Sequence, residues 1–298
     1  MRTLLVLLLL ASTAAAQPAG KQKITLGIYA PSVEFGAATQ RLAYVKALAA
    51  AIEQNTGLEV DAQSYANLGA LTKANVDFAI IDGLCYATNM NGRLLATANV
   101  GGGTTREWAL FTNAGPDIRS LRGKKLAFIA AGCNDTGFTD NAMLASEFDA
   151  SFFGARIGKP DLTAAIAEVA SYKTAQAVFA PVGSAKGLTK VWDGGAVPNP
   201  AFVDLGSKLP QQTVDKIAAA VIGYGGGGAI AGWTRPSREI YTSLAARLPK
   251  SPKSGVLAAP DLARIDSRDS LIEPPTIKDT KLVDVRHLYV RSQSARME

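Results

Sequence analysis

Short apolar runs alternate with longer segments of helical spacing along the first part of the chain. Residues 23–29, 58–63 and 76–81 have the composition of short strands. The segments between them, 39–56 and 67–73, carry apolar residues at the spacing of one helix face and therefore predict helices. Regular alternation of strands and helices is typical of an α/β fold with a parallel sheet covered by helices.

The same alternation continues in the second part of the chain. Further strands are predicted at 125–129 and 176–180, and further helices over 138–148, after Asp161, over 211–222 and over 237–248. Residues 108–112 are interpreted as a strand that crosses between two lobes. The extended stretch 196–204, interrupted by Pro198 and Pro200, is interpreted as the return of the chain.

Three polar loops follow predicted strands, and ligands of such sheets bind beyond the carboxyl ends of the strands. The loop at 132–137 also precedes a predicted helix, whose unpaired backbone N–H groups are suited to an anion. We therefore expect an anion-binding cleft, with an ordinary capped turn as the alternative. The candidate ligand-binding residues are Tyr29, Ser32, Asp82, Gly83, Cys85, Tyr86, Cys133, Asn134, Asp135, Thr136 and Gly137.

Separate roles are expected for these residues. Thr136 and the N–H groups of 134–138 would hold the anionic group. Asp82 would either face a cationic group of the ligand or cap the helix that starts at Gly83. Tyr29 and Tyr86 would either contact the ligand or pack as part of the wall.

The first 16 residues have the pattern of a secretory signal peptide. Arg2 precedes a leucine-rich run, and Ala14–Ala16 provide a small-residue cleavage site. The run is too short to span a bilayer. We expect a periplasmic protein with no membrane insertion after cleavage. The formal net charge of the 298-residue chain is +6, but the basic residues are scattered, which argues against nucleic acid as a partner.

The usual catalytic and metal-binding motifs are missing from the sequence. The single histidine, His287, lies in the C-terminal stretch, so a Ser-His-Asp or Cys-His site lacks its base in the folded part. No zinc, P-loop or dinucleotide motif is found. We expect no catalytic residue, metal or cofactor. Cys85 and Cys133, 48 positions apart, would either form a disulfide in an exported protein or remain two thiols lining the pocket.

Residues 76–83 (VDFAIIDG) and 121–128 (LRGKKLAF), followed by the polar loop, resemble the periplasmic binding proteins of phosphate, phosphite and phosphonate transport. The resemblance implies a two-lobed type 2 periplasmic-binding fold with two crossing hinge strands. It implies a first lobe of 23–107 plus 206–250 and a second lobe of 108–205. The proline, serine and charged residues that dominate from Pro249 onward predict a C-terminal extension at 251–298 that is weakly ordered or appended. The loop departs from the Ser/Thr-rich pattern of that family at Cys133, Asn134 and Asp135.

The resemblance also implies a function. The expected protein is a monomer that captures a small phosphonate-like or phosphate-like anion by hinge closure and delivers it to the membrane permease of an ABC importer. Two alternatives remain open. One is a ligand-binding sensor for a membrane kinase, and the other is an enzyme on the same scaffold that uses Cys85 or Cys133 as its nucleophile.

Overall fold

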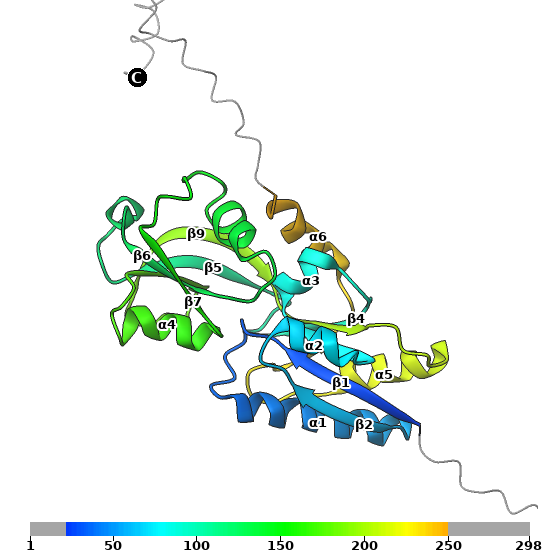
Figure 1. Cartoon of the computed structure of the whole chain (residues 1–298). Helices are drawn as coiled ribbons and strands as arrows, with labels where there is room; N and C mark the ends of the chain where they lie inside the picture. The colour runs from blue at the N-terminus through cyan, green and yellow to red at the C-terminus, as the bar shows by residue number, and fades with distance from the viewer. Residues whose placement is uncertain (1–21, 250–298) are drawn as a thin grey trace, which may run out of the picture. The chain divides into compact units, whose positions relative to one another are not determined.

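The structure is a computed structural model of the 298-residue chain, and it describes residues 22–249. The predicted signal peptide at 1–16 and the predicted extension at 251–298 lie outside the described residues. The described residues belong to one compact unit. They form two mixed sheets with helices packed against them (Figure 1).

The first sheet has six strands in the order β11-β4-β10-β3-β1-β2. The strands are β1 (Lys23–Tyr29), β2 (Glu59–Ser64), β3 (Phe78–Ile81), β4 (Arg93–Asn99), β10 (Ala201–Asp204) and β11 (Gly232–Thr234). β1 pairs in parallel with β2 and β3, as the sequence pattern predicts. β10 pairs antiparallel with β3 and β4. The carboxyl ends of β1 and β3 therefore lie side by side.

The second sheet has five strands in the order β7-β6-β8-β5-β9. The strands are β5 (Thr105–Thr112), β6 (Lys125–Ile129), β7 (Ala155–Lys159), β8 (Ala177–Pro181) and β9 (Thr189–Pro198). β6 pairs in parallel with β7 and β8, and β5 runs antiparallel between β8 and β9. The polar loop at 132–137 thus follows a strand that is paired on both sides.

The helices divide between the two sheets. They are α1 (Ala38–Thr56), α2 (Leu68–Ala74), α3 (Gly83–Asn89), η1 (Ile118–Leu121), η2 (Gly137–Met143), α4 (Leu162–Ala170), α5 (Gln211–Gly223) and α6 (Arg238–Arg247). α1 packs on β1, β2 and α5, and α4 packs on β6 and β8. Figure 1 shows α1 beside β1 and β2, and α4 beside β6 and β7. We call the first sheet with α1, α2, α3 and α5 the first lobe, and the second sheet with α4 and η2 the second lobe.

The chain passes between the lobes between β4 and β5 and again between β9 and β10. The two passages are hydrogen-bonded to each other. The backbone N–H of Asn199 donates to the carbonyl of Thr104, and its side chain donates to the carbonyls of Val100 and Gly103. α6 follows β11 and packs on α3, β9 and η2, so it contacts both lobes. The predicted return of the chain within 196–204 is therefore confirmed, whereas 108–112, predicted to cross between the lobes, lies within β5 of the second sheet and follows the first passage.

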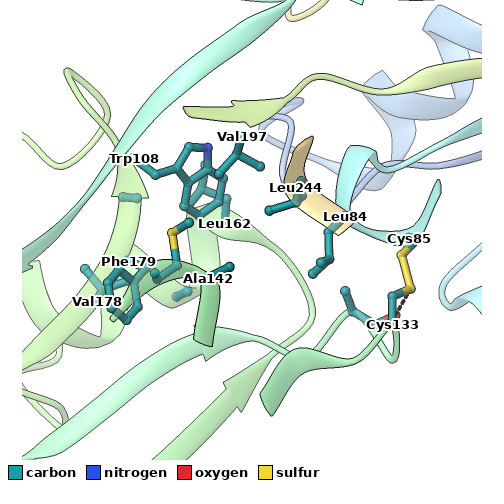
Figure 2. Close-up of a cluster of buried hydrophobic side chains, with 14 of the residues drawn as sticks. Leu84, Cys85, Trp108, Cys133, Ala142, Leu162, Val178, Phe179, Val197 and Leu244 are labelled. Atoms are coloured by element: carbon teal, nitrogen blue, oxygen red, sulfur yellow. Dashed lines mark hydrogen bonds between the residues drawn. A yellow bond between two sulfur atoms is a disulfide. The ribbon is translucent and has the colours of Figure 1, made fainter. Parts of the chain in front are cut away.

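Two clusters of buried apolar side chains make up the core. One belongs to the first lobe and lies between the first sheet, α1 and α5, around Phe78, Phe202 and Trp233. The other is continuous from the first lobe into the second, and includes Leu84, Trp108, Ala142 and Leu244 (Figure 2). The two lobes are thus joined by apolar packing as well as by the chain.

Several elements differ from the sequence predictions. The helix predicted over 138–148 is a π-helix that ends at Met143, where Ala145 and Ser146 take positive φ angles of 52° and 59°. The strands β4, β7, β9 and β11 were not predicted as such. β7 is half exposed at a sheet edge, and β9 contains Gly194 and Gly195, so neither shows a clear alternating apolar pattern.

Candidate functional site

A cavity of about 210 Å³ is lined by residues of both lobes. We call it the interlobe cavity. The first lobe contributes the loop after β1, the first turn of α1 and Ala66, and the second lobe contributes the start of α4. The backbone N–H of Leu162 donates to the carbonyl of Pro31 across the lobes, with an N···O distance of 2.9 Å. The lining residues are Val33, Phe35, Gly36, Ala37, Ala38, Arg41, Ala66, Pro160, Asp161 and Thr163.

The start of α1 gives the interlobe cavity a positive end. Within the described chain, the first turn of this 19-residue helix has no acidic residue, and Ala37 supplies no side-chain cap. Backbone N–H groups at such a helix start favour an anion. Arg41 adds a guanidinium, whose Nε donates to Ser64 Oγ at 2.7 Å. Asp161 brings a carboxylate to the same cavity from the second lobe. This carboxylate accepts from the N–H of Ala164 and caps α4.

The predicted residues of the first lobe converge on Asp82. This carboxylate is 3% exposed, and it accepts the N–H of Ser32 at 2.9 Å and the N–H of Leu84 at 3.1 Å. Of the two roles considered for Asp82, the structure shows the helix cap. Burial raises the pKa of Asp82, while the hydrogen bonds from Ser32 and Leu84 and the charge of Arg106 oppose the rise.

Gly83 packs so closely against the backbone of Pro198 that there is no room for a side chain at this position. A Cβ at this position would lie 1.9 Å from the carbonyl oxygen of Pro198. The start of α3 is therefore packed directly against the second passage between the lobes. Because Asp82 and Pro198 cover this helix start, its N–H of Leu84 is engaged by the protein itself.

The polar loop of the second lobe is organised in a similar way. The carboxylate of Asp135 accepts from the N–H groups of Gly132 at 3.0 Å and Cys133 at 3.4 Å. Asn134 takes a positive φ of 62° and its side-chain oxygen accepts from the N–H of Gly137 at 3.1 Å. Thr136 is exposed. In this arrangement, side chains of the loop occupy the N–H groups of Gly132, Cys133 and Gly137.

The two sets of predicted residues are brought together by a disulfide. Cys85 of α3 is bonded to Cys133 of the loop after β6, with their Cα atoms 4.9 Å apart. Figure 2 shows the bonded sulfur atoms beside the apolar cluster that contains Leu84 and Leu244. Of the two states considered for these cysteines, the structure shows the disulfide, and it links one lobe to the other.

Two hydrogen bonds accompany the disulfide. The Tyr29 hydroxyl donates to the carbonyl of Ala131 at 2.9 Å, and the Thr88 hydroxyl donates to the carbonyl of Cys133 at 3.0 Å. Burial, followed by the nearby carboxylates of Asp82 and Asp135, raises the pKa of Tyr29 well above its usual range. Tyr29 therefore stays protonated and remains a donor between the lobes.

Tyr86 lies on another side of α3 from these contacts. Its ring packs edge to face on Tyr241 with centroids 4.8 Å apart, and its hydroxyl is buried with no hydrogen-bond partner among residues 22–249. It lines a different cavity of about 260 Å³ within the first lobe, which we call the α2–α3 cavity. The lining residues are Leu68, Leu71, Thr72, Asn75, Val76, Ile81, Cys85, Tyr86, Asn89, Asn91 and Leu205.

Sequence reasoning missed the charged residues of the site. Arg41 occupies a polar position of an amphipathic helix, where nothing in the sequence distinguishes it from a solvated residue. Arg106 donates to Glu34 at 2.7 Å and to the carbonyl of Ser32 at 2.6 Å, and the Ser184 hydroxyl of the second lobe bonds the same Glu34. These contacts join segments 72 to 150 positions apart, so no local pattern of residues could indicate them.

Across residues 22–249, no group of three or more His, Cys, Asp or Glu side chains is arranged to hold a metal ion. In the same part of the chain, none of the helices has the length and apolar character needed to cross a bilayer.

Comparison with known proteins identifies the fold. No protein-family profile matches the chain, and no curated protein matches its sequence. Three solved structures share the architecture. PhnD1 from Prochlorococcus marinus in complex with methylphosphonate has a TM-score of 0.59 and 11% identity, and the alignment covers 76% of this chain and 96% of that one.

The other two comparisons agree. A binding protein component of an ABC phosphonate transporter from Pseudomonas aeruginosa has a TM-score of 0.56 and 12% identity, covering 72% of this chain and 82% of that one. XAC2383 from Xanthomonas citri bound to ATP has a TM-score of 0.55 and 12% identity, covering 76% and 97%. The two-lobed type 2 periplasmic-binding fold predicted from the sequence is confirmed.

Proposed function

We propose that the protein is an extracytoplasmic solute-binding protein that holds a small anion between its lobes and delivers it to the permease of an ABC importer. The interlobe cavity is the observation that carries this proposal. It is lined from both lobes, and it contains Arg41 and the uncapped start of α1. The fold supports the proposal because two of the structures that share it are described as phosphonate-binding components.

The cavity has the size and charge for a small anion. At about 210 Å³ it lies below the usual range of about 300–1,000 Å³ for pockets that take drug-sized ligands. A phosphonate, phosphate or sulfonate group would meet the N–H groups of Ala38 and Thr39 and the guanidinium of Arg41. The Asp161 carboxylate would disfavour a dianion unless the ligand also carries a hydrogen-bond donor or a cationic group.

The residues singled out from the sequence are proposed to form the closure beside this ligand. Tyr29, Cys85 and Cys133 join the lobes, and Asp82 and Asp135 hold the loops in shape. The exposed Thr136 is the one hydroxyl of the second-lobe loop proposed to reach a ligand. Ser32, Gly83, Tyr86, Asn134 and Gly137 are proposed as supporting positions.

A binding role is favoured over a cysteine enzyme. Both cysteines of the chain are joined in the disulfide, so no free thiol nucleophile is found among the described residues. A nucleophilic mechanism needs a thiolate with a neighbouring base. Residues 22–249 offer no free thiol that could supply the thiolate.

The test measures anion binding with and without the charge of Arg41. Thermal unfolding of the full mature chain is followed in dithiothreitol, so that the disulfide between the lobes cannot keep an added anion out, with methylphosphonate, phosphate, sulfate and a C2 sulfonate. We expect at least one anion to raise Tm in wild type, because a ligand that binds only the folded state stabilises it. Arg41→Gln should abolish the rise, and Lys46→Gln, an exposed position on the same helix, should keep it. No rise in wild type, or an equal rise in Arg41→Gln, would contradict the proposal.

A further inference from the structure

The Cys85–Cys133 disulfide is a third covalent connection between the lobes. The chain itself connects them twice, between β4 and β5 and between β9 and β10. Two neighbouring connections form a hinge about which one lobe rotates against the other. A third covalent bond between the lobes restricts that rotation, because its two ends must stay within bonding distance. The loops it joins are 48 positions apart in sequence and share no strand.

The remaining contacts between the loops are reversible. They include the Tyr29 hydroxyl on the carbonyl of Ala131, the Thr88 hydroxyl on the carbonyl of Cys133, and the N–H of Leu162 on the carbonyl of Pro31. Each of these bonds can be exchanged for a bond to water when the lobes part. The disulfide cannot, so it alone needs a chemical step before opening.

A route for that chemical step is present on the first lobe. Cys85 and Cys133 are 2% and 3% exposed, so the disulfide is protected from the surface as a whole. Cys85 nevertheless lines the α2–α3 cavity, whose rim includes the exposed Thr72, Asn75, Asn89 and Asn91. Cys133 does not line this cavity, and its sulfur lies 3.3 Å from the carbonyl oxygen of Ala131. The two sulfur atoms are therefore in different surroundings.

We propose that the Cys85–Cys133 disulfide is a thiol–disulfide exchange site that locks the two lobes closed, and that a dithiol entering through the α2–α3 cavity opens the lock by attacking Cys85. This inference deepens the proposed function, since on it the anion in the interlobe cavity is released only after reduction. The covalent closure itself does not depend on which ligand is bound.

The exchange takes place in two steps. A thiolate of the dithiol attacks Sγ of Cys85, the Cys85–Cys133 bond breaks, and Cys133 leaves as a thiolate that takes up a proton. The second thiol of the dithiol, as a thiolate, attacks the reagent sulfur of the mixed disulfide and releases Cys85, which is also protonated. The protein disulfide gains two electrons and two protons, and the dithiol is oxidised to its own disulfide. The Cys133 thiol can then donate to the carbonyl of Ala131, which the disulfide sulfur cannot.

Native-state hydrogen exchange tests the lock without any ligand. The N–H of Leu162 reports on separation of the lobes because its acceptor, Pro31, is in the other lobe. The N–H of Ile28, in the buried centre of β1, reports on unfolding of the first lobe. We expect dithiothreitol to speed exchange at Leu162 by at least about tenfold and to leave Ile28 unchanged.

Variants make the result specific. The Cys85→Ser/Cys133→Ser double variant should show fast exchange at Leu162 without dithiothreitol and no further response to it. If this variant does not fold, reduction of the wild-type chain supplies the same comparison. Equal exchange at Leu162 in the oxidised and reduced chain would overturn the proposal. An equal rise at Leu162 and Ile28 would also overturn it, because the disulfide would then support the fold rather than the closure.

The route is tested by closing the cavity. Asn89→Trp fills the rim of the α2–α3 cavity, and we expect it to slow reduction by dithiothreitol by at least about fivefold. Asn55→Trp, on the exposed end of α1 and away from this cavity, is the matched control and should reduce at the wild-type rate. Equal rates in the two variants would overturn the proposed route. Since none of these readouts uses an anion, their outcome is distinguishable from failure of the Arg41→Gln binding test.

Discussion

The two loops that meet at the disulfide are both held by an aspartate carboxylate, but the hydrogen bonds of the two aspartates span different distances along the chain. Each follows a strand, and each contains an aspartate whose carboxylate accepts two backbone N–H groups. Asp82 bonds Ser32, which is 50 positions away, and is 3% exposed. The Asp135 carboxylate accepts from Gly132 and Cys133, three and two positions away, and Asp135 is partly exposed. Asp82 therefore ties two loops of the first lobe together, whereas Asp135 shapes its own loop.

At both helix starts predicted to bind an anion, side chains of the chain itself accept backbone N–H groups. A helix start offers N–H groups to whichever anion is nearest. At the start of α3 the acceptor is the carboxylate of Asp82, and at the start of η2 it is the side-chain amide oxygen of Asn134. The start of α1 differs because Ala37 has no side chain that can cap it. Because no side chain of the described residues caps the start of α1, it is the helix start proposed to hold the external anion.

The largest expected effect is the loss of Asp82. Asp82→Ala leaves the buried N–H groups of Ser32 and Leu84 without acceptors, so we expect the free energy of unfolding to fall by about 3 kcal/mol. Urea denaturation measures it. Asp215→Ala, at an exposed position of α5, is the control and should change stability by less than about 0.5 kcal/mol. A loss for Asp82→Ala no larger than for the control would show that this carboxylate does not tie the loops together.

The next effect concerns the pH dependence of stability. Because burial raises the pKa of Asp82 in the folded protein, the folded state binds its proton more tightly than the unfolded state. Stability from this group is present below the unfolded pKa of about 3.9 and is lost as pH rises through the folded pKa. Relative to Asp82→Asn, wild type should therefore lose stability as pH rises above about 4, by at most about 1.4 kcal/mol per pH unit.

Urea denaturation of both proteins over a pH series gives this difference. If the free energy of unfolding of wild type instead rises with pH relative to that of Asp82→Asn, the predicted direction is wrong. It would mean that the Ser32 and Leu84 hydrogen bonds and the charge of Arg106 outweigh burial.

The smallest effect is expected at Asp135. Asp135→Ala removes bonds that stay within one partly exposed loop, so the free energy of unfolding should fall by only about 1 kcal/mol. Thermal or urea unfolding beside Asp82→Ala makes the comparison direct. A loss at Asp135 as large as that at Asp82 would remove the distinction between the two loops.

Much of the fold followed from local patterns. β1, β3, β6, α1 and α5 were predicted because their apolar residues repeat at the spacing of a strand or a helix face. The caps at Asp82 and Asp161 were also predictable, because a carboxylate two or three positions before a helical N–H acts locally. β7 and β9 were missed because their place in the sheet depends on pairing with β6 and β5 rather than on their own residues.

The candidate site was less predictable than the fold. The sequence identified the loops around Tyr29, Asp82 and Thr136 and offered a helix cap as one of two roles for Asp82, but it did not indicate that Asp82 also accepts the N–H of Ser32, 50 positions away. It also gave no reason to prefer Arg41 over any other basic residue. Whether a side chain on the polar face of a helix borders a cavity depends on the element opposite, which here is the start of α4 in the other lobe.

The sequence by itself determined the α/β alternation and the loops that end β1, β3 and β6, because these depend on residues close together in the chain. Tertiary structure alone decided that Cys85 and Cys133 are bonded, that Glu34 meets Arg106 and Ser184, and that Arg41 lies at a cavity between the lobes. Those contacts join segments far apart in sequence. Their distances are set by how the two sheets pack, and no local pattern of residues encodes that packing.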